Sequence, residues 1–293
     1  MKKCIMGVTA AIVALAMQAQ VLEVTGITPV TLPEGARVDQ AVLSPDGSSI
    51  AYTDLTAEGL HLLQADGTAT LVSPQGIAMD LSFTPDGSAI VYDAVRYDAA
   101  HRRTVAVNRY DIARGATTNL VRATRDLQGV TVATDGVHAV VDGRMESRSN
   151  AAVLSIDHGQ LCITRNGATS VLSPLGTAGM SYLWPSLSPD GTRICFYAVA
   201  MGCYTCALDG SDVRPLGWIR AARWYDNNTI VGMHDLTDGR FTTSSAIIAA
   251  KADGTARQTL TDEAYIAVLP STAPGKIAFS TVDGKLYIIN VNQ

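Results

Sequence analysis

Arginine and tryptophan residues gather in one short stretch of this chain, from Trp218 to Trp224. Arg220 and Arg223 lie between the two tryptophans. Arg together with Trp and Tyr is the composition of binding hot spots. The stretch therefore predicts a surface for an anionic ligand or for the carboxylate of a protein partner. The alternative interpretation is that the tryptophans pack between structural repeats.

Motifs for catalysis are missing from the sequence. It has no Gly-x-Ser-x-Gly elbow, no His-Glu-x-x-His and no phosphate-binding glycine loop. Its 5 histidines are scattered and do not have metal-ligand spacing. The sequence thus predicts no catalytic residues, no metal site and no cofactor, and it leans away from an enzyme.

Four cysteines follow the N-terminal apolar segment: Cys162, Cys195, Cys203 and Cys206. Cys203 and Cys206 have the redox Cys-x-x-Cys spacing, but on a strand such a pair points to opposite faces. Cys162, Cys195 and Cys206 occupy positions where other repeats have Leu, Ala or Val, which predicts buried apolar roles. A bridge from Cys195 to Cys203 or to Cys206 remains open.

A ten-residue pattern organises the chain. It runs from Leu43 to Tyr52 and returns at 83–92 and 187–196, each time with Ser/Thr-Pro-Asp-Gly followed by Ile, a small residue and an aromatic. Pro and Gly supply the backbone angles of a tight turn, and the flanking runs have strand composition. Each copy therefore predicts a hairpin between antiparallel strands.

The spacing of about 40 residues between such hairpins suggests propeller blades. Degenerate copies at 134–136, 225–228 and 274–276 bring the count to six. The expected fold is an all-β, six-bladed β-propeller of four-stranded antiparallel blades, 20–293 forming a single domain. The expected blades are 34–74, 75–122, 123–174, 175–217, 218–260 and 261–293. The segment Thr28 to Pro33 resembles an outer strand, so we expect the N-terminal strand to complete the last blade and close the ring.

The Pro-Asp-Gly hairpins followed by Ile-Ala-Tyr resemble the WD-like repeats of the TolB-type six-bladed β-propeller. The resemblance covers nearly the whole chain after residue 19 and implies architecture rather than activity. TolB also has an N-terminal α/β domain that finds no match here, so a Tol–Pal role is not implied. Some TolB-type propellers resemble pectin-degrading lyases, whose His-rich metal pocket is not evident in this sequence.

Two groups of residues form the predicted binding surface. The starts of the innermost strands should form the channel rim on the face that carries the blade-to-blade connections; its candidates are Asp39, Asp80, Gln128, Tyr182, Trp184, Arg220 and Tyr265. Arg223 and Trp224 cluster with Arg220 in one blade and belong to the same predicted binding surface. Long hairpin loops should surround this rim, at 96–103, 143–150 and 235–240, and they contribute Arg102, Arg144 and Arg240. Loops on rigid scaffolds often carry function; the alternative is that these are solvated hairpin tips.

The N-terminus predicts export. Met1-Lys2-Lys3 precedes an apolar run, which is typical of a secretory signal peptide over residues 1–19. Cys4 lies before that run rather than after it, which argues against a lipoprotein, and the run is short for a membrane span. The net charge of -5 gives no basic footprint for nucleic acid. These features predict a periplasmic, monomeric protein.

The sequence as a whole favours a binding or scaffold module of the cell envelope that holds a protein or peptide over the channel mouth. The alternative is a carbohydrate lyase or hydrolase with its site in the central channel. Convergent histidines and carboxylates in the channel would favour the enzyme, and an aromatic, Arg-rich rim would favour binding.

Overall fold

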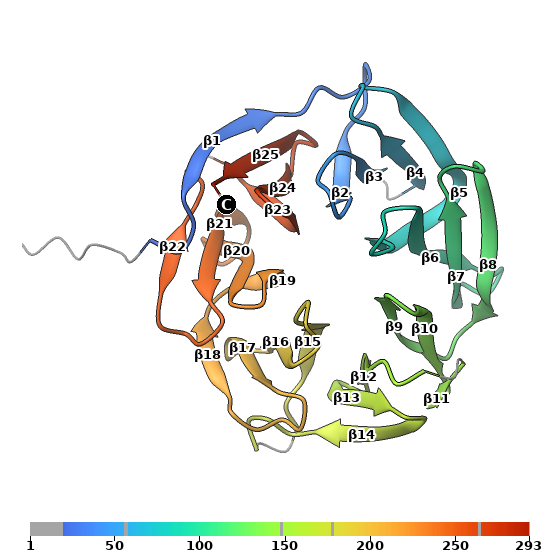
Figure 1. Ribbon diagram of the computed structural model, residues 1–293, viewed down its shortest axis with the longest axis vertical. Coiled ribbons are helices and arrows are strands. Elements are labelled where there is room, and N and C mark those ends of the chain that lie inside the picture. The colour runs from blue at the N-terminus through green and yellow to red at the C-terminus, as the bar shows by residue number, and fades with distance from the viewer. Residues whose placement is uncertain (1–19, 56–57, 147–148, 177–178, 263–264, 293) are drawn as a thin grey trace, which may run out of the picture.

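Seven blades of antiparallel strands are arranged in a ring around a central axis in the computed structural model (Figure 1). It describes residues 20–55, 58–146, 149–176, 179–262 and 265–292. The expected all-β propeller of antiparallel blades is confirmed, but the expected count of six blades is wrong. The predicted signal peptide lies outside the described residues.

The first three blades hold ten strands, one of which is shared. Blade 1 contains β2 (Val38–Leu43), β3 (Ile50–Asp54), β4 (Glu58–Leu63) and the first part of β5 (Ala69–Phe83). Blade 2 contains the second part of β5, with β6 (Ala89–Tyr97), β7 (Arg103–Asp111) and β8 (Ala116–Thr124). Blade 3 contains β9 (Leu127–Ala133), β10 (Gly136–Val141) and β11 (Arg144–Met145).

The remaining four blades complete the ring. Blade 4 contains β12 (Val153–Asp157), β13 (Gln160–Arg165) and β14 (Ala168–Leu172). Blade 5 contains β15 (Tyr182–Leu187), β16 (Arg193–Ala198), β17 (Gly202–Ala207) and β18 (Arg214–Gly217). Blade 6 contains β19 (Arg220–Asp226), β20 (Thr229–Thr237), β21 (Thr242–Lys251) and β22 (Arg257–Thr259). Blade 7 contains β23 (Ala267–Ala273), β24 (Lys276–Thr281), β25 (Leu286–Val291) and β1 (Val24–Pro29).

The extra blade comes from the segment that the repeat pattern assigned to one blade, 123–174. Here the chain makes two sheets of three strands each, in place of one sheet of four. The hairpin between β12 and β13 of blade 4 turns at His158 and Gly159, both with positive φ, and it lies beside the start of β15, where Tyr182 N–H donates to the carbonyl of Gly159 (2.8 Å). The segment 143–150 is therefore not one loop on the connection face: Ser149 donates a hydrogen bond to Asp135 (2.6 Å) in the turn between β9 and β10, on the opposite face.

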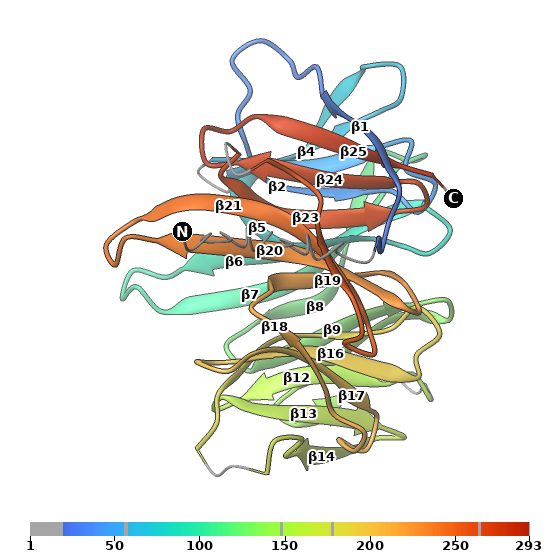
Figure 2. The same ribbon diagram turned by 90° about the vertical axis from the view of Figure 1, so that its left-hand side faces the viewer.

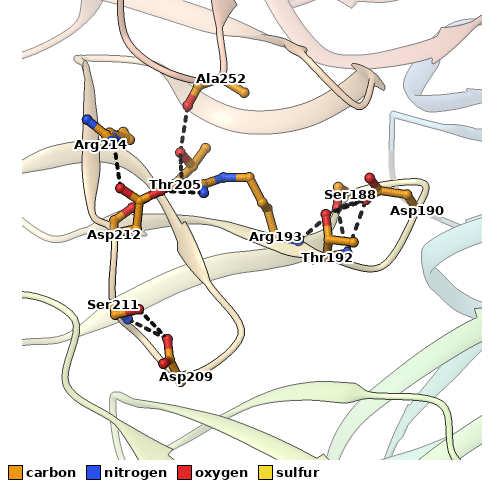
Figure 3. Close-up of polar contacts among 10 residues, drawn as sticks. All are labelled: Ser188, Asp190, Thr192, Arg193, Thr205, Asp209, Ser211, Asp212, Arg214 and Ala252. Atoms are coloured by element: carbon orange, nitrogen blue, oxygen red, sulfur yellow. Dashed lines mark hydrogen bonds and ion pairs between the residues drawn. The ribbon is translucent and has the colours of Figure 1, made fainter.

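The Ser/Thr-Pro-Asp-Gly turns are held by their own side chains. In blade 5 the Ser188 hydroxyl donates to Asp190 Oδ1 (2.6 Å), and the Asp190 carboxylate accepts from the Thr192 backbone N–H (3.0 Å), as Figure 3 shows. Equivalent contacts hold the pKa of Asp46 and of Asp86 down to about 2. The recurrence of Asp in these turns is thus explained by turn structure.

Apolar residues fill the space between neighbouring blades. One cluster joins blades 6 and 7 and contains Val231, Ile247, Ile277 and Phe279. Hydrogen bonds also link blades: Thr205 Oγ1 donates to the carbonyl of Ala252 (2.6 Å) (Figure 3). Within the described part of the chain, no helix is long and apolar enough to cross a membrane.

The N-terminal strand closes the ring, as expected. β1 pairs antiparallel with β25, with Ile27 opposite Ile289. Just before β1, the Gln258 side chain of β22 accepts hydrogen bonds from the backbone N–H groups of Val21 (2.6 Å) and Leu22 (2.9 Å). Because both of those side chains are buried, the N-terminal segment joins blade 6 to blade 7.

Candidate functional site at the channel mouth

Figure 2 shows the ring from its side, so that one face of the ring points left and the other points right. The hairpins β6–β7 and β20–β21 extend to the left in that view. We call this the connection face, because the blade-to-blade connections lie on it too, apart from the one between blades 3 and 4, where Ser149 lies at the β9–β10 turn. The opposite face carries the Pro-Asp-Gly turns. The innermost strands start at the connection face, where the sequence predicts the rim, except β12 of blade 4, whose end rather than start lies beside the start of β15 (Tyr182 N–H donates to the carbonyl of Gly159, 2.8 Å).

A bulge recurs near the start of the innermost strands. The pairing register shifts after Val38, Met79, Leu183, Arg220 and Val268. Inside these bulges Asp80, Trp184, Ala221 and Leu269 have φ between 46 and 49°. Bulges re-aim side chains and are frequent near functional sites. The predicted rim residues Asp39, Asp80 and Trp184 occupy equivalent bulge positions in three blades.

A cleft of about 330 Å³ opens between blades 2 and 3 at this end of the channel. Its polar lining comes from Asp80 and Ser82 of β5, Asp93 of β6, Arg103 of β7 and Gln128 of β9. Valines, a leucine and a glycine form the rest of the wall. Two residues of the predicted rim, Asp80 and Gln128, therefore meet in one cavity.

Asp93 is the unusual group in this cleft. It is only 9% exposed, and no hydrogen bond or ion pair reaches its carboxyl group within the described residues. Burial, reinforced by the negative charge of Asp80, raises the pKa of Asp93 to about 7, against the opposing effect of Arg103. A carboxyl group of this kind changes its charge near neutral pH.

Arg223 is half-buried and lies within electrostatic range of Asp80. Burial lowers the pKa of the Arg223 guanidinium, and the charge of Asp80 opposes that shift. Its Nη1 donates to the carbonyl of Ala222 (3.2 Å). Arg223 of blade 6 thus adds a half-buried positive charge within electrostatic range of Asp80.

A second cluster lies between blades 5 and 6. The Arg220 guanidinium lies 5.5 Å from the centre of the Trp184 ring, and Trp184 packs against Tyr197 at 5.6 Å between ring centres. Arg220 also pairs with Asp235, which accepts a hydrogen bond from Ser245 (2.7 Å). The structure therefore brings Arg220 and Trp184 together, as predicted, but Asp235 neutralises the arginine. The cluster therefore carries charges of both signs.

Three predicted site residues belong to the apolar core instead. Trp224 is buried between blades 5 and 6, where its Nε1 donates to the carbonyl of Ser186 (3.2 Å). Tyr182 is buried and packs edge-on against Phe196. Tyr265 is half-buried and packs against Phe279 and Tyr287. For these three residues the structure agrees with the alternative interpretation, in which the aromatic side chains pack in the core.

The burial of Trp224 gives a testable contrast with Trp218, which is 51% exposed. We expect Trp224→Ala to lower the free energy of unfolding by about 3–5 kcal/mol, because it leaves a large cavity. Trp218→Ala should change it by about 0.5 kcal/mol or less, as is usual for surface positions. Urea unfolding of the two variants measures both values. Equal effects would contradict these placements.

The three hairpin arginines are exposed and lie on separate blades. Arg102 pairs with Asp98 (2.7 Å) within its own hairpin. Arg240 has its backbone N–H bonded to Asp238 (2.8 Å), and Arg144 opens the short strand β11. They form no common site with one another, so only their place on the connection face agrees with the prediction.

The first blade brings a further acidic pair to the rim. Burial and the charge of Asp54 raise the pKa of Asp39. His61 stacks on Tyr52 at 5.0 Å between ring centres, and burial lowers the pKa of the His61 imidazole.

Across the described residues, no group of three or more His, Cys, Asp or Glu side chains is placed to hold a metal ion.

All four cysteines of the described chain are buried, and none of them forms a disulfide. Cys195 Sγ and Cys203 Sγ lie 3.6 Å apart between blades 5 and 6. Cys206 faces the other side of its sheet, in the cluster between blades 4 and 5. The expectation that Cys203 and Cys206 point to opposite faces is therefore confirmed, and only Cys203 lies beside Cys195.

Exposed apolar side chains concentrate on the connection face. Of the 13 large apolar residues that are exposed in the described chain, three lie on outer strands: Leu71, Leu120 and Val171. The others lie on the connection-face hairpins, the connections or the first residues of inner strands: Leu55, Met79, Tyr97, Leu183, Val199, Met201, Trp218, Leu236, Phe241 and Val282. We call these ten the apolar rim.

Asp93 and Arg103 were not among the predicted site residues. A comparison of equivalent positions in the repeat could have identified Asp93 as a site residue. The residue after the aromatic of the ten-residue pattern is Thr53 in blade 1 and Asp93 in blade 2, and Thr53 is fully buried. A carboxylate at a position buried elsewhere in the repeat indicates a special site.

Comparison with known proteins places the chain among β-propellers. No protein-family profile matches it, and no curated protein matches its sequence. Solved structures do match over most of its length. A virginiamycin B lyase from Staphylococcus aureus, in complex with quinupristin, has a TM-score of 0.64 at 11% identity, covering 91% of this chain and 99% of its own.

Two further solved structures have similar scores. An oligogalacturonate lyase from Vibrio parahaemolyticus has a TM-score of 0.58 at 12% identity, covering 91% of this chain and 94% of its own. A putative TolB from Agrobacterium tumefaciens has a TM-score of 0.56 at 14% identity, covering 88% and 91%. At these identities the similarity establishes the fold and not the activity.

Proposed function

We propose that the protein is an exported, periplasmic binding or scaffold module that holds a protein or peptide partner on its connection face. The apolar rim is the observation that carries this proposal, because large exposed apolar groups on one face mark interaction surfaces. The structural similarity to a TolB supports an envelope role. The N-terminal Lys-Lys and apolar segment supports export.

The polar groups of the same face suit a partner held over the channel mouth. Apolar hairpins such as those of Tyr97 and Phe241 surround charged groups of both signs, Asp80, Arg103 and Arg220. An apolar contact area with a few fixed charges gives affinity through burial and orientation through the ion pairs.

Site-specific photo-crosslinking in the producing cell tests this proposal. A photoreactive amino acid replaces Phe241 in one variant and Trp218 in another, and Leu120 on β8 provides a matched exposed control. We expect both connection-face variants to crosslink to the same discrete partner, and the Leu120 variant not to. A partner that crosslinks at Leu120 as strongly, or no discrete product at Phe241 and Trp218, would contradict the proposal.

A second candidate is an enzyme that acts on a carbohydrate, with its site in the channel. The pair Asp93 and Asp80 supports it, because a carboxyl group with a pKa of about 7 can both donate and accept a proton near neutral pH. Two of the similar structures are lyases. Ultraviolet absorbance of new double bonds in oligogalacturonates tests the candidate. Turnover that Asp93→Asn abolishes and Asp98→Asn retains would support it, and absence of turnover would contradict it.

A further inference from the structure

The cleft between blades 2 and 3 combines a size, a charge pattern and an unpartnered buried group that together specify a ligand. Its volume of about 330 Å³ admits a molecule of the size of an amino acid. None of the ten residues of the apolar rim lines the cleft, although Asp80 and Arg103 of the cleft are also among the charged groups proposed to orient the partner.

Asp93 is the group in the cleft that lacks a partner. Its side chain is nine-tenths buried, lines the cavity, and has no hydrogen bond or ion pair within the described residues. Its carboxyl oxygens are not among the fully enclosed, unpartnered side-chain atoms of the described residues, so water or a ligand donor can reach them from the cavity. A ligand donor in the cleft would satisfy this carboxyl group.

The neighbouring charges favour a cationic donor. Asp80 of β5 adds another carboxylate to the same cavity, so two acceptors face a shared space. An ammonium group, with three N–H donors and a positive charge, complements the two carboxylates.

The cations around the cleft are two arginines. Arg103 of β7 lines the same cavity within electrostatic range of Asp93, and the lining from β9 between Leu127 and Val132 brings no charged group. Arg223 of β19 lies within electrostatic range of Asp80 and is not part of the cavity lining. Arg103 therefore complements a carboxylate or carbonyl at the other end of the ligand.

The apolar wall suits an aliphatic group. Val91, Val105 and Val132 line the cavity beside the polar residues. Burial of an aliphatic side chain against them adds affinity in proportion to its area. An ammonium group, an aliphatic side chain and a carboxylate or carbonyl occur together in an α-amino acid and in the N-terminal residue of a peptide.

We infer that this cleft binds the α-ammonium group of an aliphatic amino acid, either free or at the N-terminus of a peptide, between Asp93 and Asp80. The bound ammonium group requires the ionised form of Asp93. Since burial raises the pKa of Asp93 to about 7, binding below this pH releases a proton, and affinity rises with pH.

Isothermal titration of the full protein tests the inference with three probes, L-valine, Val-Gly-Gly and N-acetyl-L-valine, and with buffer alone as the blank. We expect the free amines to bind and N-acetyl-L-valine not to bind, because acetylation removes the charge. Affinity should rise by about tenfold between pH 5.5 and pH 7.0. Below pH 7 an α-amino group remains largely protonated, so the change reports on the protein. Binding enthalpies in buffers of different ionisation enthalpy should show proton release.

The variant Asp93→Asn should weaken binding at pH 7.0 and remove the pH dependence. Asp98→Asn, at the exposed tip of the same blade, is the matched control and should bind as the unchanged protein does. Tighter binding of the tripeptide would assign a peptide N-terminus as the ligand, and binding of valine alone would assign a free amino acid.

Three results would overturn the inference. They are equal binding of N-acetyl-L-valine, absence of binding by both free amines at pH 7.0, and a pH dependence that persists in Asp93→Asn. The proton-release measurement on the unchanged protein stands by itself if the variant does not fold. Failure of these tests leaves the crosslinking result at Phe241 unaffected, so the two proposals fail separately.

Discussion

Replacing Asp93 with Asn should stabilise the protein at pH 8, by about 2–4 kcal/mol. In the folded state burial raises the pKa of Asp93 from 3.8 to about 7. The folded state therefore binds a proton more tightly than the unfolded state does. Stability from this group is fully present below pH 3.8 and is lost as pH rises through 7. The loss is about 1.4 kcal/mol for each pH unit between the two pKa values. Asn carries no charge at any pH and avoids that loss.

Urea unfolding at pH 5 and at pH 8 measures this effect. The unchanged protein should lose stability between the two values by more than Asp93→Asn does. Asp98→Asn is the control, because hydrogen bonds from Arg102 lower the pKa of Asp98 and its titration lies below this range. A lower stability of Asp93→Asn at pH 8 would contradict the account of the cleft.

Deleting residues 20–33 should lower the melting temperature by about 10–20 °C. The deletion removes β1, exposes the edge of β25, and takes Val21 and Leu22 out of the core between blades 6 and 7. Burial of each such side chain contributes about 1.5–3 kcal/mol. For a chain of this length each kcal/mol corresponds to about 2–4 °C.

Thermal unfolding followed by circular dichroism checks this prediction. A synthetic peptide of residues 20–33, added to the truncated protein, should restore much of the decrease in melting temperature, because the peptide can pair with β25 again. Gln258→Ala removes only the contacts with Val21 and Leu22 and should have a smaller effect. An unchanged melting temperature in the deleted protein would contradict ring closure by β1.

The architecture could be predicted from sequence because each blade depends on local chemistry. A Ser/Thr-Pro-Asp-Gly turn forms its own hydrogen bonds, as between Ser44 and Asp46 (2.6 Å), so the pattern indicates a hairpin wherever it occurs. The match between the segment before Pro33 and the outer strands likewise indicated the closing strand. Both features are readable within a single short segment of the chain.

The number of blades could not be predicted in the same way. Blade 4 turns at Asp157-His158-Gly159, a short hairpin without proline. Blades 3 and 4 have three strands each in place of four. Because both blades are short, a single four-stranded blade with one long loop could account for the same number of residues. Strand count per blade depends on packing against neighbouring blades, which local patterns do not contain.

The site was predicted in part for a similar reason. The bulges near the starts of the inner strands were not visible in sequence, but the strand starts were, and so Asp80, Trp184 and Gln128 could be named as rim candidates. Asp93 and Arg103 lie on the second and third strands of blade 2, and they line the same cavity because blades 2 and 3 pack against each other. Trp224 looked like a binding residue because sequence composition does not reveal burial.

The most direct test of the binding cleft is the titration of the Asp93 carboxyl group by carbon-13 NMR, with and without L-valine. We predict a pKa near 7 without ligand and a fall on addition of the ammonium ligand, because the bound cation favours the ionised form. A free-protein pKa of Asp93 close to the ordinary value of 3.8, with no response to ligand, would contradict both the buried, unpartnered state of Asp93 and its role as a binding group.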